Sequence, residues 1–99
     1  MFGPNGNPVS KITWEEYTKW QRWDEFPERA DNPPLTVETD FWYNNQEYLI
    51  TSLRGEYVIV TMPDFNELIV NKNFLNLLTT PFIDGKSFKE LINGFLFEV

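Results

Sequence analysis

Two closely spaced tight turns constrain the fold more than any other feature of this sequence. Asn44-Asn45 offers residues that tolerate positive φ, as a two-residue hairpin turn requires, and Arg54-Gly55 supplies the next turn. The segments beside these turns are rich in β-branched and aromatic residues, which favour strands. We therefore predict an antiparallel meander of three strands, over residues 36–43, 47–53 and 56–62.

Apolar residues occupy both faces of the second and third predicted strands. A sheet wetted on one side would alternate apolar and polar residues more cleanly, so we expect both faces to be at least partly covered. Counting outward from the first turn places Phe41 opposite Tyr48. We expect Val58 and Val60 to be buried.

Helix signals lie on both sides of the predicted meander. Thr13 and Glu16 have the spacing of a capping box, and Ile12 with Tyr17 suits a hydrophobic staple. We expect a helix from about residue 14 to residue 23, because Pro27 prevents a longer one. Residues 27–34 hold three prolines and should form a loop within one domain.

The C-terminal part shows the same capping pattern twice. Asp64 with Glu67, followed by apolar residues at helical spacing, predicts one or two helices over residues 65–78. Ser87 with Glu90 predicts a further helix that Gly94 ends. Residues 95–99 suit a last short strand or an extended apolar plug.

These elements predict an α+β fold. An N-terminal aromatic helix and short C-terminal helices would pack on a three-stranded antiparallel meander, with a possible short C-terminal strand. The 99 residues suffice for one compact core, so we expect a single domain over residues 11–99. Residues 1–10, rich in Gly, Pro and Asn, are expected to form a flexible tail.

Composition excludes several kinds of site. The chain has no cysteine and no histidine, which removes thiolate metal sites, the commonest general base and the Ser-His-Asp triad. Gly85-Lys86-Ser87 resembles the end of a phosphate-binding loop, but Thr80 stands where that pattern needs glycine. We interpret it as a turn before a helix cap, and we expect neither a metal nor another cofactor.

The formal net charge of −7 indicates the kind of partner. Nucleic acid requires a basic footprint, which this chain lacks, and no stretch is long and apolar enough for a membrane helix. The N-terminus does not resemble a signal peptide, so a cytoplasmic location is the default. Many asparagines and a single alanine hint at a low-GC bacterium or its phage.

An aromatic residue recurs at every third position of the first helix and just beyond it. Because an α-helix turns 100° per residue, this stripe drifts by about 240° over its length, so one flat sheet cannot cover all of it. Part of the stripe either packs beneath the proline loop or stays exposed beside acidic residues, as at protein-binding hot spots. The stripe consists of Trp14, Tyr17, Trp20, Trp23 and Phe26. The residues predicted to bind a partner are Trp20, Trp23, Asp24, Glu25 and Glu28.

Glu38 and Asp40 lie two apart on a predicted strand and therefore share one face. Paired carboxylates can perform acid–base chemistry when their pKa values are driven apart. Because no cleft or nucleophile is recognisable near them, we interpret them as a solvated strand edge.

The sequence thus favours a non-enzymatic, acidic protein-interaction module that binds a basic protein. An inhibitor, an immunity-type protein or an antitoxin-type protein of bacterial or phage origin would fit. The alternative is a binder of small molecules or carbohydrates that uses Trp20, Trp23 or Trp42 as stacking platforms. An enzyme based on Glu38 and Asp40 is the third hypothesis.

Overall fold

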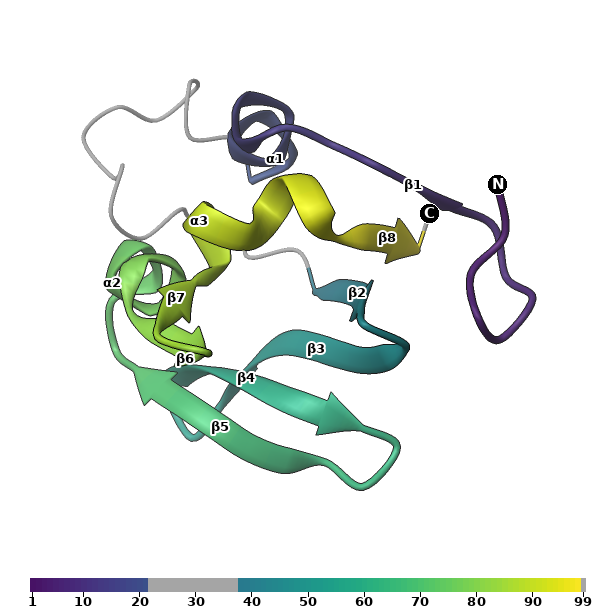
Figure 1. Cartoon of the computed structure of the whole chain (residues 1–99). Helices are drawn as coiled ribbons and strands as arrows, with labels where there is room; N and C mark the ends of the chain where they lie inside the picture. Colours follow the sequence, from purple (N-terminus) through teal and green to yellow (C-terminus); the bar gives the residue numbers. More distant parts are fainter. Residues whose placement is uncertain (22–37, 99) are drawn as a thin grey trace.

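The computed structural model of the chain describes residues 1–21 and 38–98 (Figure 1). Its main feature is an antiparallel sheet with strand order β1-β8-β2-β3-β4-β5, so the predicted three-stranded meander is the centre of a six-stranded sheet. Short helices and the β6-β7 hairpin complete the α+β fold. The strands are β1 Val9–Ser10, β2 Thr39–Tyr43, β3 Gln46–Leu53, β4 Glu56–Met62, β5 Asn66–Asn71, β6 Pro81–Ile83, β7 Lys86–Ser87 and β8 Leu96–Glu98. The α-helices are α1 Trp14–Trp20, α2 Phe74–Thr79 and α3 Phe88–Leu91, the last followed by a 3₁₀ turn over Ile92–Gly94.

Both predicted turns form as expected. Asn44, Asn45, Arg54 and Gly55 all have positive φ, between 50° and 76°, which is the backbone that two-residue hairpins need. The resulting register of β2 and β3 places Phe41 opposite Tyr48, and their rings stack with centroids 5.2 Å apart.

The predicted helix over residues 65–78 is wrong in its first half, where β5 pairs with β4 instead. The side chain of Asp64 does not cap a helix but accepts a hydrogen bond from Asn66 Nδ2 (2.8 Å). A helix here would have left the apolar strand β4 with an unpaired edge, and Ile69 and Val70 are β-branched residues that suit a strand. The helical part begins only at Phe74, capped by the side chain of Asn73.

The last strand, β8, lies between β1 and β2 and pairs with both (Figure 1). The two ends of the chain therefore meet at one side of the sheet. Residues 1–10, expected to be a flexible tail, contain β1 and an N-terminal loop in which Gly3 and Asn7 are hydrogen-bonded through their backbones (2.8 Å).

One core holds the helices on the sheet. The capping boxes at Thr13–Glu16 and Ser87–Glu90 both form as predicted, and they direct Tyr17 and Phe88 into this core. Fully burying one such side chain contributes about 1.5–3 kcal/mol. Its largest buried members are Tyr17, Phe41, Ile50, Ile59, Phe74, Leu77, Leu78, Phe88, Phe95 and Phe97.

The opposite face of the sheet, which we call the outer face, is covered in part, as expected. Val58 and Val60 alternate with Ile59, lie outside the main core cluster, and are only 1% and 0% exposed. Val70 pairs with Val58 on the same face but is 41% exposed. Burial on this face therefore ends at β5.

Val60 and Val70 give a matched test of the sheet. We expect Val60→Asp to unfold the domain, because burying an unpaired carboxylate costs several kcal/mol against a total stability of about 5–15 kcal/mol. Val70→Asp introduces the same group on the same face at an exposed position and should leave a cooperative thermal melt. A Val60→Asp protein that melts cooperatively near the parent temperature would show that this assignment is wrong.

Candidate functional site

Three carboxylates from three neighbouring strands meet on the outer face of the sheet. Asp40 comes from β2, Glu47 from β3 and Glu98 from β8, and one oxygen of each lies within 4.8 Å of the others. We call this group the carboxylate cluster. Trp42 lies directly opposite Glu47 in the β2-β3 register, and Phe41 lies opposite Phe97 in the β2-β8 register. Because side chains alternate along each strand, these pairings bring the three carboxylates to one side.

Glu98 connects the cluster to the N-terminal loop. Its Oε1 accepts hydrogen bonds from Asn5 Nδ2 (2.8 Å) and from Asn7 Nδ2 (3.0 Å). The bond from Asn5 is the largest influence on this carboxyl and lowers its pKa, with Asn7 and Asp40 acting in the same direction against the effect of burial. Glu98 therefore holds its negative charge more firmly than a free glutamate does.

The surroundings of Asp40 have the opposite effect on its carboxyl group: they favour the protonated form. Its Oδ1 is buried and makes no hydrogen bond, and the same holds for the neighbouring indole nitrogen of Trp42. Burial, followed by the adjacent carboxyls of Glu47 and Glu98, raises the pKa of Asp40 from 3.8 to about 8. Asp40 thus carries a proton at neutral pH, since three carboxylates this close cannot all be ionised without a cation.

This arrangement corrects the sequence-based interpretation of Asp40. β2 is not at the edge of the sheet, because β8 pairs on its far side, and Asp40 is half-buried with its Oδ1 shielded from solvent. Glu38 is not part of the cluster; its Oε2 accepts a hydrogen bond from Thr51 Oγ1 (2.7 Å). The expected Glu38–Asp40 pair is replaced by a set of acids that are distant in sequence.

Carboxylates grouped in this way can bind a cation. Carboxylate oxygens are hard ligands that suit divalent cations, and they also accept hydrogen bonds from ammonium and guanidinium groups. In the described ranges 1–21 and 38–98, the one ion pair joins Arg54 to Glu67 (3.0 Å), so no base of these ranges neutralises the cluster. A raised carboxyl pKa also suits a general acid.

Only one of the predicted partner-binding residues lies in the described part of the chain. Trp20 is 37% exposed at the end of α1, and its ring packs edge-on against Phe97 with centroids 6.2 Å apart. Tyr17 of the same stripe is fully buried, and its hydroxyl is hydrogen-bonded to Thr39 Oγ1 (2.9 Å). Trp23, Asp24, Glu25 and Glu28 lie outside the described residues, so the predicted patch is untested there.

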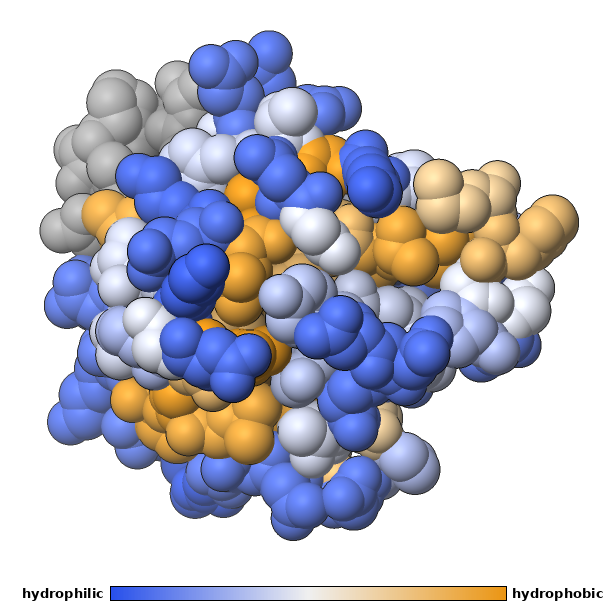
Figure 2. Space-filling view, viewed as in Figure 1, coloured by the Kyte–Doolittle hydropathy of each residue, from blue (hydrophilic) through white to orange (hydrophobic). Residues whose placement is uncertain are grey.

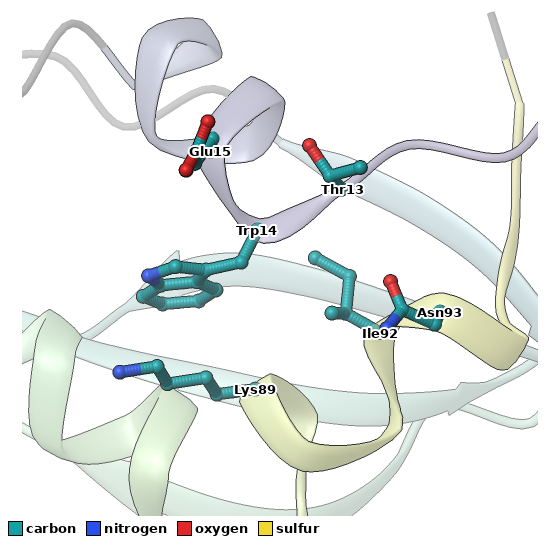
Figure 3. A pocket seen from close by; sticks show the side chains of 6 residues that line it. All are labelled: Thr13, Trp14, Glu15, Lys89, Ile92 and Asn93. Atoms are coloured by element: carbon teal, nitrogen blue, oxygen red, sulfur yellow. The ribbon is translucent and has the colours of Figure 1, made fainter.

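A shallow groove of about 470 Å³ runs between the start of α1 and α3 (Figure 3). Its central feature is the indole of Trp14, with Lys89 Nζ 5.1 Å from the ring centroid. The Tyr17 ring lies 6.2 Å from the same indole at an interplanar angle of 29°. Figure 3 shows the side chain of Lys89 lying along the indole of Trp14. This contact joins α3 to α1 and covers part of the indole face.

The raised pKa of Asp40 predicts a pH dependence of stability. The unfolded chain loses this proton near pH 4 and the folded chain near pH 8, so the contribution of Asp40 is most favourable below about pH 4 and is lost as the pH rises to about 8. Asp40→Asn should therefore raise the melting temperature by an amount that grows across this window. Asp84→Asn, in an exposed turn, is the control. An equal effect of Asp40→Asn at pH 5 and pH 8 would contradict the prediction.

Glu98 affects the stability of the fold over a different, lower pH range. Because its pKa is lowered, its stabilising effect is present above its ordinary value of 4.5 and is lost as the pH falls below it. We expect neither Zn²⁺ nor Mg²⁺ to raise the melting temperature at neutral pH, because zinc sites are built mainly from Cys and His, which the chain lacks, and Mg²⁺ gives up its water reluctantly. A rise that Asp40→Asn abolishes would instead identify a divalent cation site.

No helix among the described residues has the length and apolar character needed to cross a membrane. We compared the chain with family models, with curated proteins and with solved structures. None of the three comparisons returned a match.

Proposed function

We propose that this protein is a non-enzymatic, acidic interaction module whose carboxylate cluster receives a lysine or arginine of a basic partner protein. The observation that carries the proposal is the cluster itself: Asp40, Glu47 and Glu98 lie within 4.8 Å of one another without a basic residue from the described ranges. An ammonium or guanidinium group would satisfy carboxylate oxygens with charge-assisted hydrogen bonds.

The surroundings of the cluster support a protein partner. Glu38 and Glu56 lie on the same outer face, and neither is ion-paired within the described ranges. Acidic charge beside the cluster speeds the encounter with a basic protein. Trp42 borders the cluster, and tryptophan is enriched among the residues that dominate protein interfaces.

The proton on Asp40 gives this binding a distinctive signature. A cation that enters the cluster stabilises the ionised form of Asp40, so binding releases the proton. Affinity should rise as the pH increases from about 6 to about 8 and fall as the salt concentration increases. A contact with the isolated surface acids would show the salt effect without this pH effect.

The predicted patch at Trp20, Trp23, Asp24, Glu25 and Glu28 stays a proposal for a second contact with the same partner. An inhibitor, immunity-type or antitoxin-type role, a bacterial or phage origin and a cytoplasmic location also stay proposals, since they rest on size, charge and composition.

The alternative proposal, a binder of small molecules or carbohydrates, depends on a free tryptophan face. In the groove at Trp14, Lys89 Nζ lies 5.1 Å from the centroid of the indole, and the indole nitrogen of Trp42 is buried. Trp20 packs against Phe97, and Trp23 lies outside the described residues. These contacts favour the protein-binding proposal over the sugar-binding one.

Capture with matched baits tests the proposal. The parent protein, Glu47→Gln and Asp84→Asn are immobilised and exposed to the same lysate, and the retained proteins are quantified. We expect a basic protein to be retained by the parent and by Asp84→Asn, with affinity for Glu47→Gln lowered about tenfold or more, because close charge pairs at interfaces couple by at least about 1.5 kcal/mol.

The pH dependence of this interaction provides the decisive control. Calorimetry in buffers of different ionisation enthalpy should detect proton release on binding by the parent and none by Asp40→Asn. Equal retention by Glu47→Gln and the parent, or binding without proton release, would place the partner elsewhere on the surface.

A further inference from the structure

The N-terminal loop carries an Asn-Gly pair, the dipeptide in which asparagine most readily loses its side-chain nitrogen without an enzyme. The chain contains two such pairs, Asn5-Gly6 and Asn93-Gly94. In this reaction the backbone nitrogen of the glycine attacks Cγ of the asparagine, and glycine favours the attack because it has no side chain to obstruct it. All four residues are exposed, so burial of the side chains does not distinguish the two pairs.

The reaction balances with water as its only co-reactant. A bond forms between the glycine nitrogen and Cγ, which closes a succinimide ring, and the side-chain nitrogen leaves as ammonia with the proton that the glycine N–H gives up. Water then opens the ring at either of its carbonyls. One opening yields aspartate, and the other yields isoaspartate, whose backbone runs through the β-carbon and is longer by a methylene group.

The fold protects the pair at Asn93 more than its exposure suggests. Asn93 and Gly94 belong to the 3₁₀ turn, and the next residue, Phe95, donates its backbone N–H to Ile92 O (3.1 Å). Phe95 is fully buried in the core. Ring closure rotates the peptide that joins the pair out of helical geometry, so the reaction at Asn93 requires the turn to unwind beside a buried core residue.

Asn5 lies in a loop that has no such attachment to the core. Figure 1 and Figure 2, which share one view, show this loop projecting at the right of the molecule. Gly6 N–H donates to Gly3 O (2.9 Å) and has to leave this acceptor, but a short exposed loop opens at a lower cost than a turn held by the core. Asn7 N–H donates to Asn5 Oδ1 (3.0 Å), the oxygen that becomes negative during the attack, and so stabilises this charge.

We propose that Asn5 is a deamidation site and that its conversion releases the N-terminal loop from the carboxylate cluster. Asn5 Nδ2 donates to Glu98 Oε1 across 2.8 Å. An aspartate at position 5 has no N–H to donate, and it places a second carboxylate against Glu98, so a hydrogen bond becomes a repulsion. Isoaspartate has the same result, because its longer backbone no longer fits the hydrogen bond from Gly3 N–H to Asn7 O.

Ageing of the full chain at mildly alkaline pH, followed by peptide mass spectrometry, tests the site. We expect Asn5 to convert at least about tenfold faster than Asn93, since an opening free energy lower by about 1.4 kcal/mol gives a tenfold larger open population. In urea, where the fold no longer separates the pairs, the two rates should become similar. Conversion of Asn93 in the folded protein as fast as that of Asn5 would overturn the assignment. The reaction needs no basic partner, so this test and that of the proposed function can fail separately.

Hydrogen exchange of a product mimic tests the release of the loop. Asn5→Asp should speed exchange of the Gly3 and Val9 amides, whose backbone hydrogen bonds close the loop, by about tenfold or more, the change that a loss of about 1.4 kcal/mol produces. Asn93→Asp adds the same charge at the other pair and should leave these two amides unchanged. Unchanged exchange of Gly3 and Val9 in Asn5→Asp would overturn the proposed release.

A double variant separates the hydrogen bond from a general effect of charge. Asn5→Asp combined with Glu98→Gln exchanges the donor and the acceptor, so the glutamine amide can donate to the aspartate. We expect this combination to restore slow exchange of the Gly3 and Val9 amides. Exchange that stays fast in the double variant would show that the bond between Asn5 and Glu98 does not fasten the loop, which would contradict the proposal.

Discussion

The pairing of β8 with β2 is the interaction on which the rest of the structure depends. On the core side it sets Phe97 opposite Phe41, and with Phe88 and Phe95 these rings fill the space beneath the helices. On the outer side the same pairing brings Glu98 beside Asp40. One strand contact thus creates both the main aromatic core and the carboxylate cluster.

This double role explains how a costly cluster can persist. Desolvating Asp40 beside two other acids is unfavourable, and its raised pKa is the measure of that cost. The aromatic packing of Phe41 and Phe97 lies directly behind the cluster and offsets the cost. The amides of Asn5 and Asn7 add hydrogen bonds that keep Glu98 ionised.

The sequence predicted the features that arise from neighbouring residues. The turns at Asn44-Asn45 and Arg54-Gly55 and two of the capping boxes depend on local backbone geometry, and all of them form. The apparent capping box at Asp64 failed because the unpaired edge of β4 outweighed a local preference that is worth only about 1 kcal/mol.

The carboxylate cluster could not be predicted from patterns of neighbouring residues. Asp40, Glu47 and Glu98 come from three strands, and Glu98 joins them only because β8 inserts between β1 and β2. The sequence offered a short strand or an apolar plug for residues 95–99, which did not specify a neighbour. The remaining signal was an acidic residue beside two aromatic residues in one strand, at Asp40, Phe41 and Trp42, and its value depended on knowing the partner strands.

Direct titration of the Asp40 carboxyl carbon by nuclear magnetic resonance tests the central claim most closely. The chemical shift reports the protonation of this one group, without any contribution from unfolding or from a partner. A cluster that shares a proton predicts a midpoint near pH 8, which should return toward the ordinary value of 3.8 when Glu47→Gln removes one neighbouring acid. A midpoint near 3.8 in the parent protein would mean that Asp40 is ionised and solvated at neutral pH, and the account of the cluster would be wrong.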